Sequence, residues 1–323
     1  MIVVTGAAGF IGSCLVAKLN ALGRQDLLVV DHYENDQDAS RRNLANKKYV
    51  RFYDKAEFLK LAQRDNIDAD VTCLFHMGAC SSTTLDDAAY FQKNNYEYSI
   101  AMAQWAWKHQ VRFIYASSAA TYGDGQQGYD DNEEVLETLK PLNLYGDSKH
   151  RFDLWVKQQG FLRRCAGLKF FNVFGPNEYH KGDMQSVIAK SYAKVRDQGR
   201  MLLFKSHRPD YKDGEQKRDF VYVKDVVDVM LFLMEHKDVN GIFNVGTGQA
   251  RSWNDVAHAL FSALHKTAQI NYVDMPSILL DKYQYFTQAN MGKLRRAGYS
   301  KPFTSLEDAV KDYCVYLSNS QVW

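Results

Sequence analysis

Cysteine and proline are both scarce in this sequence, and their scarcity restricts the classes of protein it represents. The 323 residues include five cysteines and five prolines. The cysteine count is odd and no two cysteines form a C-x-x-C pair, so we expect neither a disulfide framework nor a zinc site. The sequence therefore predicts a protein of the reducing cytoplasm, with no metal ion in its site.

Long apolar runs and a surplus of either charge are also missing. No run approaches the ~18 apolar residues that a membrane-spanning helix needs. Lysine plus arginine total 40 and aspartate plus glutamate total 38, which is too balanced for a dedicated nucleic-acid binder. The first six residues lack the basic region of a signal peptide. We therefore expect no nucleic acid and no membrane as a partner, and a small molecule as the ligand.

The chain does contain enough apolar material for a large core. Hydrophobic residues make up 46% of it, which excludes wholesale disorder, and its length fits two domains at about 150 residues each. Apolar, strand-like runs occupy residues 2–5, 27–30, 71–75, 111–116, 168–174 and 241–245, and helical spacing lies between them at 11–22, 95–109 and 148–158. This alternation predicts an α/β fold whose parallel sheet is covered on both faces.

A glycine-rich turn follows the first of these runs. Gly6, Gly9 and Gly12 lead into the helical segment, and Asp31 ends the second run. Glycines let backbone N–H groups approach a phosphate at a helix N-terminus, and the carboxylate accepts hydrogen bonds from a ribose. We therefore predict a Rossmann-type, doubly wound domain that binds a dinucleotide, formed by residues 1–171 plus roughly 219–250. Residues 172–218 plus roughly 251–323 are expected to form a smaller, discontinuous α/β substrate-binding domain.

A second constellation points to hydride chemistry. Tyr145 and Lys149 are four residues apart, so a helix places them on one face. A phenol with a pKa of about 10 is a poor base at neutral pH, and a neighbouring ammonium makes the phenolate more accessible. Ser118 follows the run 111–116 and is suited to hydrogen-bond a substrate hydroxyl as a hydride leaves. We expect all three residues to be catalytic.

These motifs resemble a known superfamily. The spacing G-x-x-G-x-x-G with Ser118, Tyr145 and Lys149 is similar to the extended short-chain dehydrogenase/reductase superfamily, whose serine stands five residues before a glycine, here Gly123. Segments 171–176, 218–223 and 243–248 resemble its nucleotide-sugar enzymes in general. Segments 78–84, 178–182 and 283–289 are narrower, and together they resemble the ADP-L-glycero-D-manno-heptose 6-epimerase family over nearly the whole chain.

The resemblance implies a function and a mechanism. Such an enzyme epimerises C6 of the heptose in ADP-D-glycero-β-D-manno-heptose for lipopolysaccharide core synthesis. A tightly bound NADP, one per subunit, takes a hydride from C6 and returns it to the other face. Two proton handlers are then needed, and the family implies Tyr145 for one face and Lys181 of the His-Lys-Gly segment for the other. The family also implies a homo-oligomer, and it suggests a pentamer as its form.

Further contacts are carried over from the family to matching positions. The cofactor contacts, beyond the glycine turn and Lys149, are Phe10, Ile11, Asp31, His32, Lys55, Met77, Gly78, Ala79, Cys80, Ser81, Asn94 and Val173. Arg41 is added for its charge alone. The substrate contacts, beyond Ser118, are Asn172, Asp183, Lys190, Phe204, Lys205, Ser206, His207, Arg218 and Tyr283. Two positions depart from the family pattern, because Met77 stands where glutamate is usual and Asp183 where serine is usual.

Two questions stay open on the residues alone. Asp31 favours the free ribose hydroxyl of NAD, whereas Arg41, Arg42 and Lys55 are suited to pair with the extra phosphate of NADP, so we expect NADP with NAD as the alternative. The other question is the reaction. A UDP-hexose 4-epimerase, a sugar reductase or a non-catalytic NADP(H)-binding protein would share the generic motifs. A 4,6-dehydratase is disfavoured, because Ala119 and Ala120 follow Ser118 where an Asp-Glu pair is expected.

Overall fold

A seven-stranded parallel sheet forms the centre of the molecule. The computed structural model describes residues 1–67, 69–280 and 283–323. The strands of this sheet are β1 (Ile2–Thr5), β2 (Leu27–Asp31), β3 (Arg51–Asp54), β4 (Cys73–His76), β5 (Arg112–Ser118), β6 (Cys165–Phe170) and β10 (Gly241–Val245). Their order is β10-β6-β5-β4-β1-β2-β3, and every neighbouring pair is parallel. All carboxyl ends therefore meet at one edge, and the order reverses between β1 and β4, where ligands bind in such sheets.

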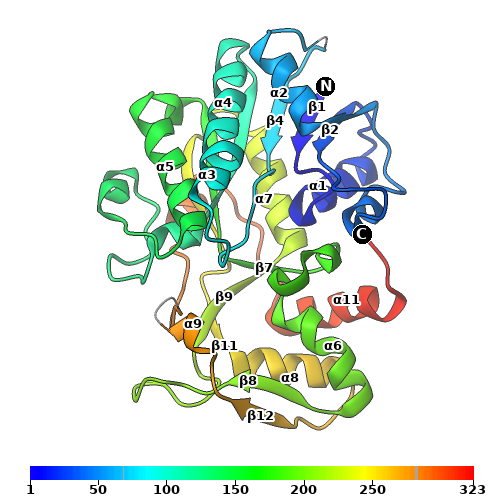
Figure 1. The fold of residues 1–323 in the computed structure, drawn as a ribbon, viewed down its shortest axis with the longest axis vertical. Helices are drawn as coiled ribbons and strands as arrows, with labels where there is room; N and C mark the ends of the chain where they lie inside the picture. The colour runs from blue at the N-terminus through cyan, green and yellow to red at the C-terminus, as the bar shows by residue number, and fades with distance from the viewer. Residues whose placement is uncertain (68, 281–282) are drawn as a thin grey trace.

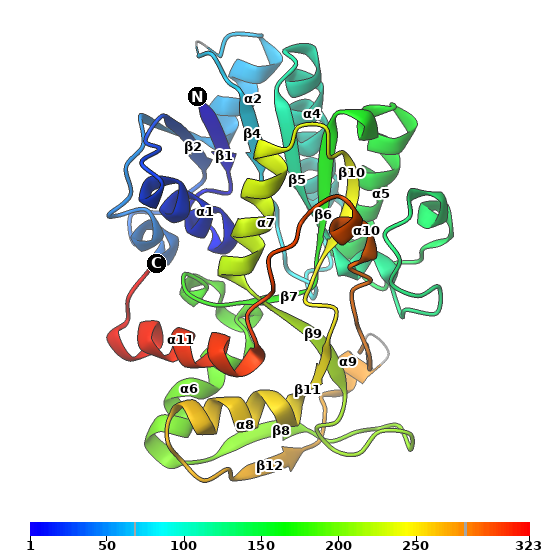
Figure 2. The ribbon, with the colours of Figure 1, turned by 180° about the vertical axis from the view of Figure 1, so that it is seen from behind.

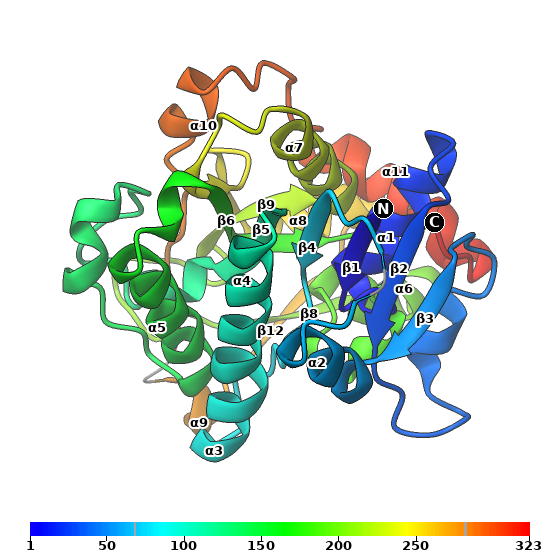
Figure 3. The same ribbon diagram turned by 90° about the horizontal axis from the view of Figure 1, so that it is seen from above.

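Helices cover both faces of this sheet, as Figure 3 shows from above. One face carries α2 (Lys55–Gln63), α4 (Tyr98–Lys108) and α5 (Leu144–Gln158), and the other carries α1 (Phe10–Ala21) and α7 (Val223–Glu235). Alternate strand residues serve the two layers: Val3 packs in the cluster under α4 and α5, whereas Val4 packs in the cluster under α1 and α7. Burial on both faces explains why these strands are almost continuously apolar.

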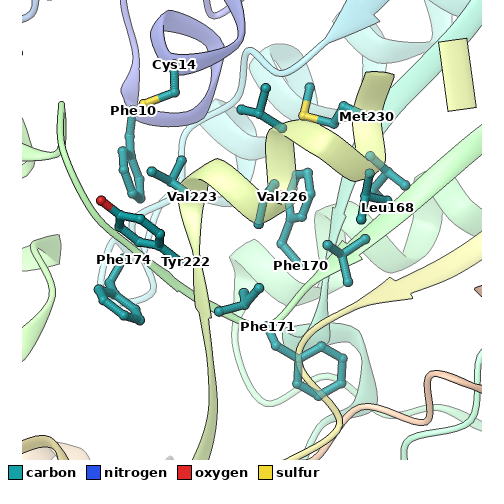
Figure 4. Packing of buried hydrophobic residues seen from close by; sticks show 14 of the residues in the cluster. Phe10, Cys14, Leu168, Phe170, Phe171, Phe174, Tyr222, Val223, Val226 and Met230 are labelled. Atoms are coloured by element: carbon teal, nitrogen blue, oxygen red, sulfur yellow. The ribbon is translucent and has the colours of Figure 1, made fainter. Parts of the chain in front are cut away.

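The larger of the two hydrophobic clusters extends from the sheet toward the second part of the molecule. Figure 4 shows Phe10 of α1, Phe174 and Tyr222 close to the first turns of α7, with Leu168 and Phe170 on the adjoining strand. The same cluster includes Ile188 and Leu260, which belong to helices far from the sheet. A continuous core thus joins the sheet to the rest of the molecule.

The second part lies beyond the carboxyl edge of the sheet (Figures 1 and 2). It contains α6 (Val187–Gln198), α8 (Trp253–Ala263) and two small sheets, of which one pairs β8 (Met201–Phe204) with β12 (Ile270–Val273) in parallel. The other has the order β11-β9-β7 and consists of β7 (Asn172–Phe174), β9 (Lys217–Tyr222) and β11 (Ala250–Ser252). The remaining helices are α3 (Ala88–Phe91), α9 (Ser277–Leu280), α10 (Gly292–Arg296) and α11 (Leu306–Asn319).

The predicted α/β class and the doubly wound parallel sheet are confirmed, and one predicted strand is wrong. Residues 168–174 were expected to form a single strand, but β6 ends at Phe170 and β7 starts at Asn172 in another sheet. The chain turns at Phe171, whose carbonyl accepts a hydrogen bond from Val173 N at 2.9 Å. An unbroken apolar run does not reveal such a turn. The proposed domain boundaries stay a prediction.

One strand of the central sheet was not expected. β3 forms the sheet edge, has only Tyr53 buried and contains Arg51 and Asp54, so it lacks the apolar run that marked the other strands. Within the three described ranges, no helix is both long enough and apolar enough to cross a membrane.

Candidate active site

A cavity of about 880 Å³ opens at the carboxyl edge of the central sheet. Its walls come from the turns that follow β1, β2, β4, β5 and β6, and from the segment Tyr179–Met184 of the second part. The predicted catalytic residues Ser118, Tyr145, Lys149 and Lys181 all line it. So do these predicted cofactor contacts: Gly6, Gly9, Phe10, Ile11, Gly12, Asp31, His32, Lys55, Met77, Gly78, Ala79, Cys80, Ser81, Asn94, Lys149 and Val173.

The glycine turn is shaped by close backbone contacts. Gly6 has φ +66°, and a Cβ there would lie 2.6 Å from Gly78 Cα. A Cβ on Gly12 would lie 2.1 Å from the Gly6 carbonyl oxygen. The turn therefore requires glycine at both positions, and it brings the first turn of α1 to the cavity wall. A helix N-terminus without covering side chains fits a diphosphate.

Asp31 supports this turn from the end of β2. Its Oδ2 accepts hydrogen bonds from Ala8 N at 2.7 Å and Gly9 N at 3.2 Å, and its Oδ1 accepts one from His32 N at 2.8 Å. Burial raises the pKa of Asp31, and these backbone N–H groups oppose the shift. The carboxylate thus holds the turn while it faces the cavity.

The cavity wall beyond Asp31 is acidic. Glu34 and Asp38 line it together with Ser40 and His32. Arg41, another predicted cofactor contact, lies outside the set of described residues that line the cavity, and its contact stays a prediction. Its guanidinium instead pairs with Asp36 at 3.2 Å and lies 4.2 Å from the centre of the Tyr33 ring. Asp36 therefore competes with the expected phosphate group for the positive charge of Arg41.

Asn95 is a site residue that the sequence analysis missed. Its side chain binds both backbone groups of Cys80, with Cys80 N at 2.8 Å and Cys80 O at 2.9 Å, and it also donates to Ser148 Oγ at 3.0 Å. It lies in the π-helix Gln92–Glu97, a rare element that is frequent at functional sites. The same segment presents Asn94, which accepts a hydrogen bond from Lys55 Nζ at 3.1 Å. No motif marks a π-helix in the sequence.

Ser118, Tyr145 and Lys149 meet where β5 ends and α5 begins. Asn143 caps α5 by accepting from Gly146 N at 2.8 Å, so the helix starts just before Tyr145. Burial raises the pKa of Tyr145, and a hydrogen bond with the Ser118 hydroxyl opposes that shift. Lys149 donates from Nζ to the Ala116 carbonyl at 2.8 Å, and burial lowers its pKa to about 8. A cation with a pKa near neutrality is thus held one helical turn from the phenol.

Lys181 brings a second titratable group to the same cavity from another element. Its Nζ lies 5.3 Å from the centre of the Phe10 ring. Burial lowers its pKa, and the carboxylate of Glu178 opposes that shift. Glu178 is itself buried and accepts hydrogen bonds from Ser186 Oγ at 2.7 Å and Gly175 N at 3.3 Å. The fixed carboxylate positions the segment that carries the lysine.

The predicted substrate contacts fall into two groups. Asn172 and Asp183 line the cavity beside Ser118. The others lie outside the set of described residues that line it: Lys190, Phe204, Lys205, Ser206, His207, Arg218 and Tyr283. Trp253 connects the two groups, because it lines the cavity and donates from Nε1 to Tyr283 Oη at 2.8 Å. Arg218 lies over the Tyr283 ring at 5.0 Å.

His76 ends β4 beside the cofactor turn and has a structural role. Its Nδ1 lies 2.7 Å from Thr5 Oγ1 and its Nε2 lies 2.9 Å from Ser99 Oγ. Burial lowers the pKa of His76 to about 3, with Lys149 adding to the shift. The ring is therefore neutral at physiological pH and serves as a hydrogen-bonded part of the core.

Comparison with known proteins places these features in a family. Residues 2–246 match the family model described as the NAD dependent epimerase/dehydratase family. An ADP-L-glycero-D-manno-heptose-6-epimerase of Nitratidesulfovibrio vulgaris is 51% identical over 313 residues, covering 97% of this chain and 96% of that protein. One of Fusobacterium nucleatum is 45% identical over 323 residues, again covering 97% and 96%.

Solved structures agree on the fold. The ADP-L-glycero-D-manno-heptose-6-epimerase of Helicobacter pylori matches with a TM-score of 0.81 and 28% identity, covering 98% of this chain and 96% of that one. A UDP-glucose 4-epimerase of Thermotoga maritima with UDP-glucose also matches at 0.81, with 26% identity and 99% of each chain covered. The backbone alone therefore does not separate the two activities, whereas the sequence relatives do.

Proposed function

The chain belongs to the NAD dependent epimerase/dehydratase family and, within it, to the ADP-L-glycero-D-manno-heptose-6-epimerases, and we propose that it inverts C6 of an ADP-linked heptose. The substrate is ADP-D-glycero-β-D-manno-heptose, the product is the L-glycero epimer, and the product serves lipopolysaccharide core synthesis. One observation carries this proposal: Tyr145 and Lys181, two proton-handling groups on different elements, line one cavity with the glycine turn.

The residues present fit a nicotinamide dinucleotide. The turn leaves no room for a side chain at Gly6 or Gly12, and the first turn of α1 faces the cavity, as a diphosphate requires. Asp31 is suited to accept hydrogen bonds from a ribose. When bound, the cofactor supplies reversible hydride transfer at C6.

The chain's own residues handle the protons. As the C6–H bond breaks and its electron pair leaves as hydride, the Tyr145 phenolate takes the proton of the C6 hydroxyl and Ser118 hydrogen-bonds its oxygen. The Lys149 ammonium favours the phenolate. After the transient carbonyl has turned, the Lys181 ammonium donates a proton to its oxygen as C6 is reduced on the other face. Loss of the proton from Tyr145 to water and gain of a proton from water by Lys181 then restore the starting state. Net oxidation is zero, so the cofactor is reused in place.

The choice of cofactor has two candidates. NADP is the first candidate, because a cation near Asp31 would offset the repulsion between this carboxylate and the 2′-phosphate. Lys55, which lines the cavity, supports this candidate. NAD is favoured by a specific observation, since Asp31, Glu34 and Asp38 line the same region and would repel a 2′-phosphate. Calorimetric titration of the apoprotein with each dinucleotide decides between them. If NADP is the cofactor, Lys55→Met weakens NADP binding at least about tenfold and leaves NAD binding unchanged.

The experiment on the function itself is a turnover assay without added cofactor. We expect the purified protein to convert ADP-D-glycero-β-D-manno-heptose to a mixture of the C6 epimers, as followed by proton NMR, with no net nicotinamide reduction. UDP-glucose is the control substrate, because a UDP-hexose 4-epimerase shares the fold. If the protein converts UDP-glucose and not the heptose, the proposed substrate is wrong.

The expected homo-oligomer and the cytoplasmic location are also proposals. Sedimentation equilibrium tests the homo-oligomer.

A further inference from the structure

A fully buried ion pair lies behind the catalytic residues, between α5 and the sheet. Lys169 Nζ of β6 is 3.1 Å from Asp153 Oδ2 of α5, and both side chains are at most 1% exposed. In β5 and β6, Ser117 pairs in register with Lys169 and Tyr115 pairs with Gly167. Because side chains alternate along a strand, Tyr115, Ser117 and Lys169 share the face that α5 covers. Asp153 of α5 contacts this polar group.

The side-chain hydrogen bonds of the pair lead to β5 and to the turn that follows it. Asp153 accepts hydrogen bonds from Tyr115 Oη at 2.9 Å and from Ser117 Oγ at 2.7 Å. Lys169 donates to Thr121 Oγ1, and Thr121 in turn donates to the Ser118 carbonyl at 2.8 Å. Asp153 thus holds the side chain of Ser117, and Lys169 holds the backbone carbonyl of Ser118 through Thr121.

Lys149 is tied to the same stretch. Its Nζ donates to the carbonyl of Ala116, immediately before Ser117, and Asp153 stands one helical turn further along α5. Tyr145, Lys149 and Asp153 are therefore successive members of one helix face. The helix that carries the phenol and the ammonium is joined to the strand that carries the serine through Asp153 and Lys149.

Electrostatics adds a second link between the pair and Lys149. Burial lowers the pKa of Lys149, and the carboxylate of Asp153 opposes that shift. The other groups that face Lys149 are Tyr145 on its own helix, Cys80 in the turn after β4 and His76 at the end of β4, which is neutral. Among the described residues, Asp153 is thus the carboxylate that opposes the effect of burial on the pKa of Lys149.

Stability gives little reason for such a pair. Removing two charges from water costs several kcal/mol per ion, and apolar residues of similar volume often stabilise a core more. We propose that Asp153 and Lys169 are positioning residues of the reaction, which hold Ser118 and the strand end that binds Lys149 in place against Tyr145. This inference rests on the proposed catalytic roles of those three residues.

The test combines four variants with two matched controls. Asp153→Asn and Lys169→Met each remove one charge, and Ser117→Ala and Thr121→Val remove single links without leaving a charge unpaired. Asp225→Asn and Lys293→Met are the controls. Asp225 is also buried and accepts from Thr304 N at 2.8 Å, and Lys293 is tied to Glu133 and to the Ile242 carbonyl, away from the cavity.

We expect kcat of all four test variants to fall by about tenfold to a hundredfold with a nearly unchanged KM, because misplacement by about 1 Å has that cost. The controls should lose stability and keep kcat. In Asp153→Asn, the pH above which kcat declines should fall by about one unit, since an opposite charge within a few Å shifts a pKa by that order. In Lys169→Met it should not fall.

A second measurement does not depend on turnover. Competitive acetylation at low extent, read by mass spectrometry across pH, reports the titration of Lys149 directly in each folded variant. Unchanged titration of Lys149 in Asp153→Asn, or variants that follow the controls in kcat, would overturn the inference. An inactive wild type would instead contradict the proposed function. The titration of Lys149 would then still show whether Asp153 raises the pKa of Lys149. If the charge variants do not fold, Ser117→Ala and Thr121→Val decide the positioning role.

Discussion

At the scale of single residues, three lysines, of which Lys149 and Lys169 are buried, show how surroundings assign a role. Lys149 is held by the Ala116 carbonyl, Lys181 faces Glu178, and Lys169 is paired with Asp153. The sequence predicted the first two from their motifs. It did not predict Lys169, because a lysine within an apolar run reads as a strand residue, and its partner is sixteen positions away on a helix. Only the packing of α5 on β6 brings the pair together.

The two proton handlers are expected to be separately essential. Tyr145→Phe and Lys181→Met should each lower kcat by about a hundredfold to ten-thousandfold, because each removes one acid–base group. Cofactor binding should persist, since neither change alters a glycine of the turn or Asp31. Steady-state kinetics with a dinucleotide titration checks this. Lys194→Met on α6 is the control, because Lys194 lies outside the described cavity lining, and an equal loss of kcat in it would contradict the special role of Lys181.

The pH dependence of kcat follows from Lys149. Burial lowers its pKa to about 8, and its ammonium form is the one that favours the phenolate. Activity should therefore be full below that value and decline as the pH rises through it. A kcat profile from pH 6 to 10 measures this. A plateau that continues to pH 10 would show that the charge on Lys149 is not needed.

At the scale of elements, turns and caps set the site more than the strands do. The glycine turn was predictable, because its function demands glycine at fixed spacing. The π-helix Gln92–Glu97 and its Asn95 were not, since a π-helix has no characteristic sequence spacing. The break between β6 and β7 at Phe171 was hidden for a related reason, because both strands are apolar and the turn uses no glycine or proline.

A pair of glycine substitutions separates backbone strain from close packing in the turn. Gly6 has φ +66° and Gly23 has φ +80°, so alanine is strained at both, by about 1 to 3 kcal/mol. At Gly6 the new Cβ would also meet the Gly78 backbone, whereas nothing lies within 4 Å at Gly23. We expect Gly6→Ala to be less stable to urea than Gly23→Ala and to bind dinucleotide far more weakly. Equal effects would contradict the close-approach explanation.

At the scale of the whole molecule, the sequence predicted the sheet better than the second part. Strands of a buried parallel sheet are marked by continuous apolar runs, and the helices between them indicate parallel pairing. In the second part, β8 and β12 are only half buried, and β9 pairs with strands from both sides of α7 in the chain, so local pattern carries little information about pairing.

Stability toward acid should depend on His76. In the folded protein its pKa is about 3, against 6.5 when free. The unfolded chain therefore binds one more proton between these values, and stability is lost as the pH falls through that window, by about 1.4 kcal/mol per unit. The advantage of wild type over His76→Gln in urea unfolding should shrink by that amount per unit below pH 6.5. The exposed His265→Asn is the control, and its difference from wild type should stay constant.

The central claim is that this chain inverts C6 of an ADP-heptose by transient oxidation. The most direct measurement uses substrate deuterated at C6, in ordinary water, with no cofactor added. The account predicts that the L-glycero epimer forms and keeps deuterium at C6, because the hydride leaves and returns without exchange with solvent. Epimerised product with hydrogen at C6 would contradict the hydride mechanism, and the absence of any C6 epimer with both dinucleotides supplied would contradict the proposed function.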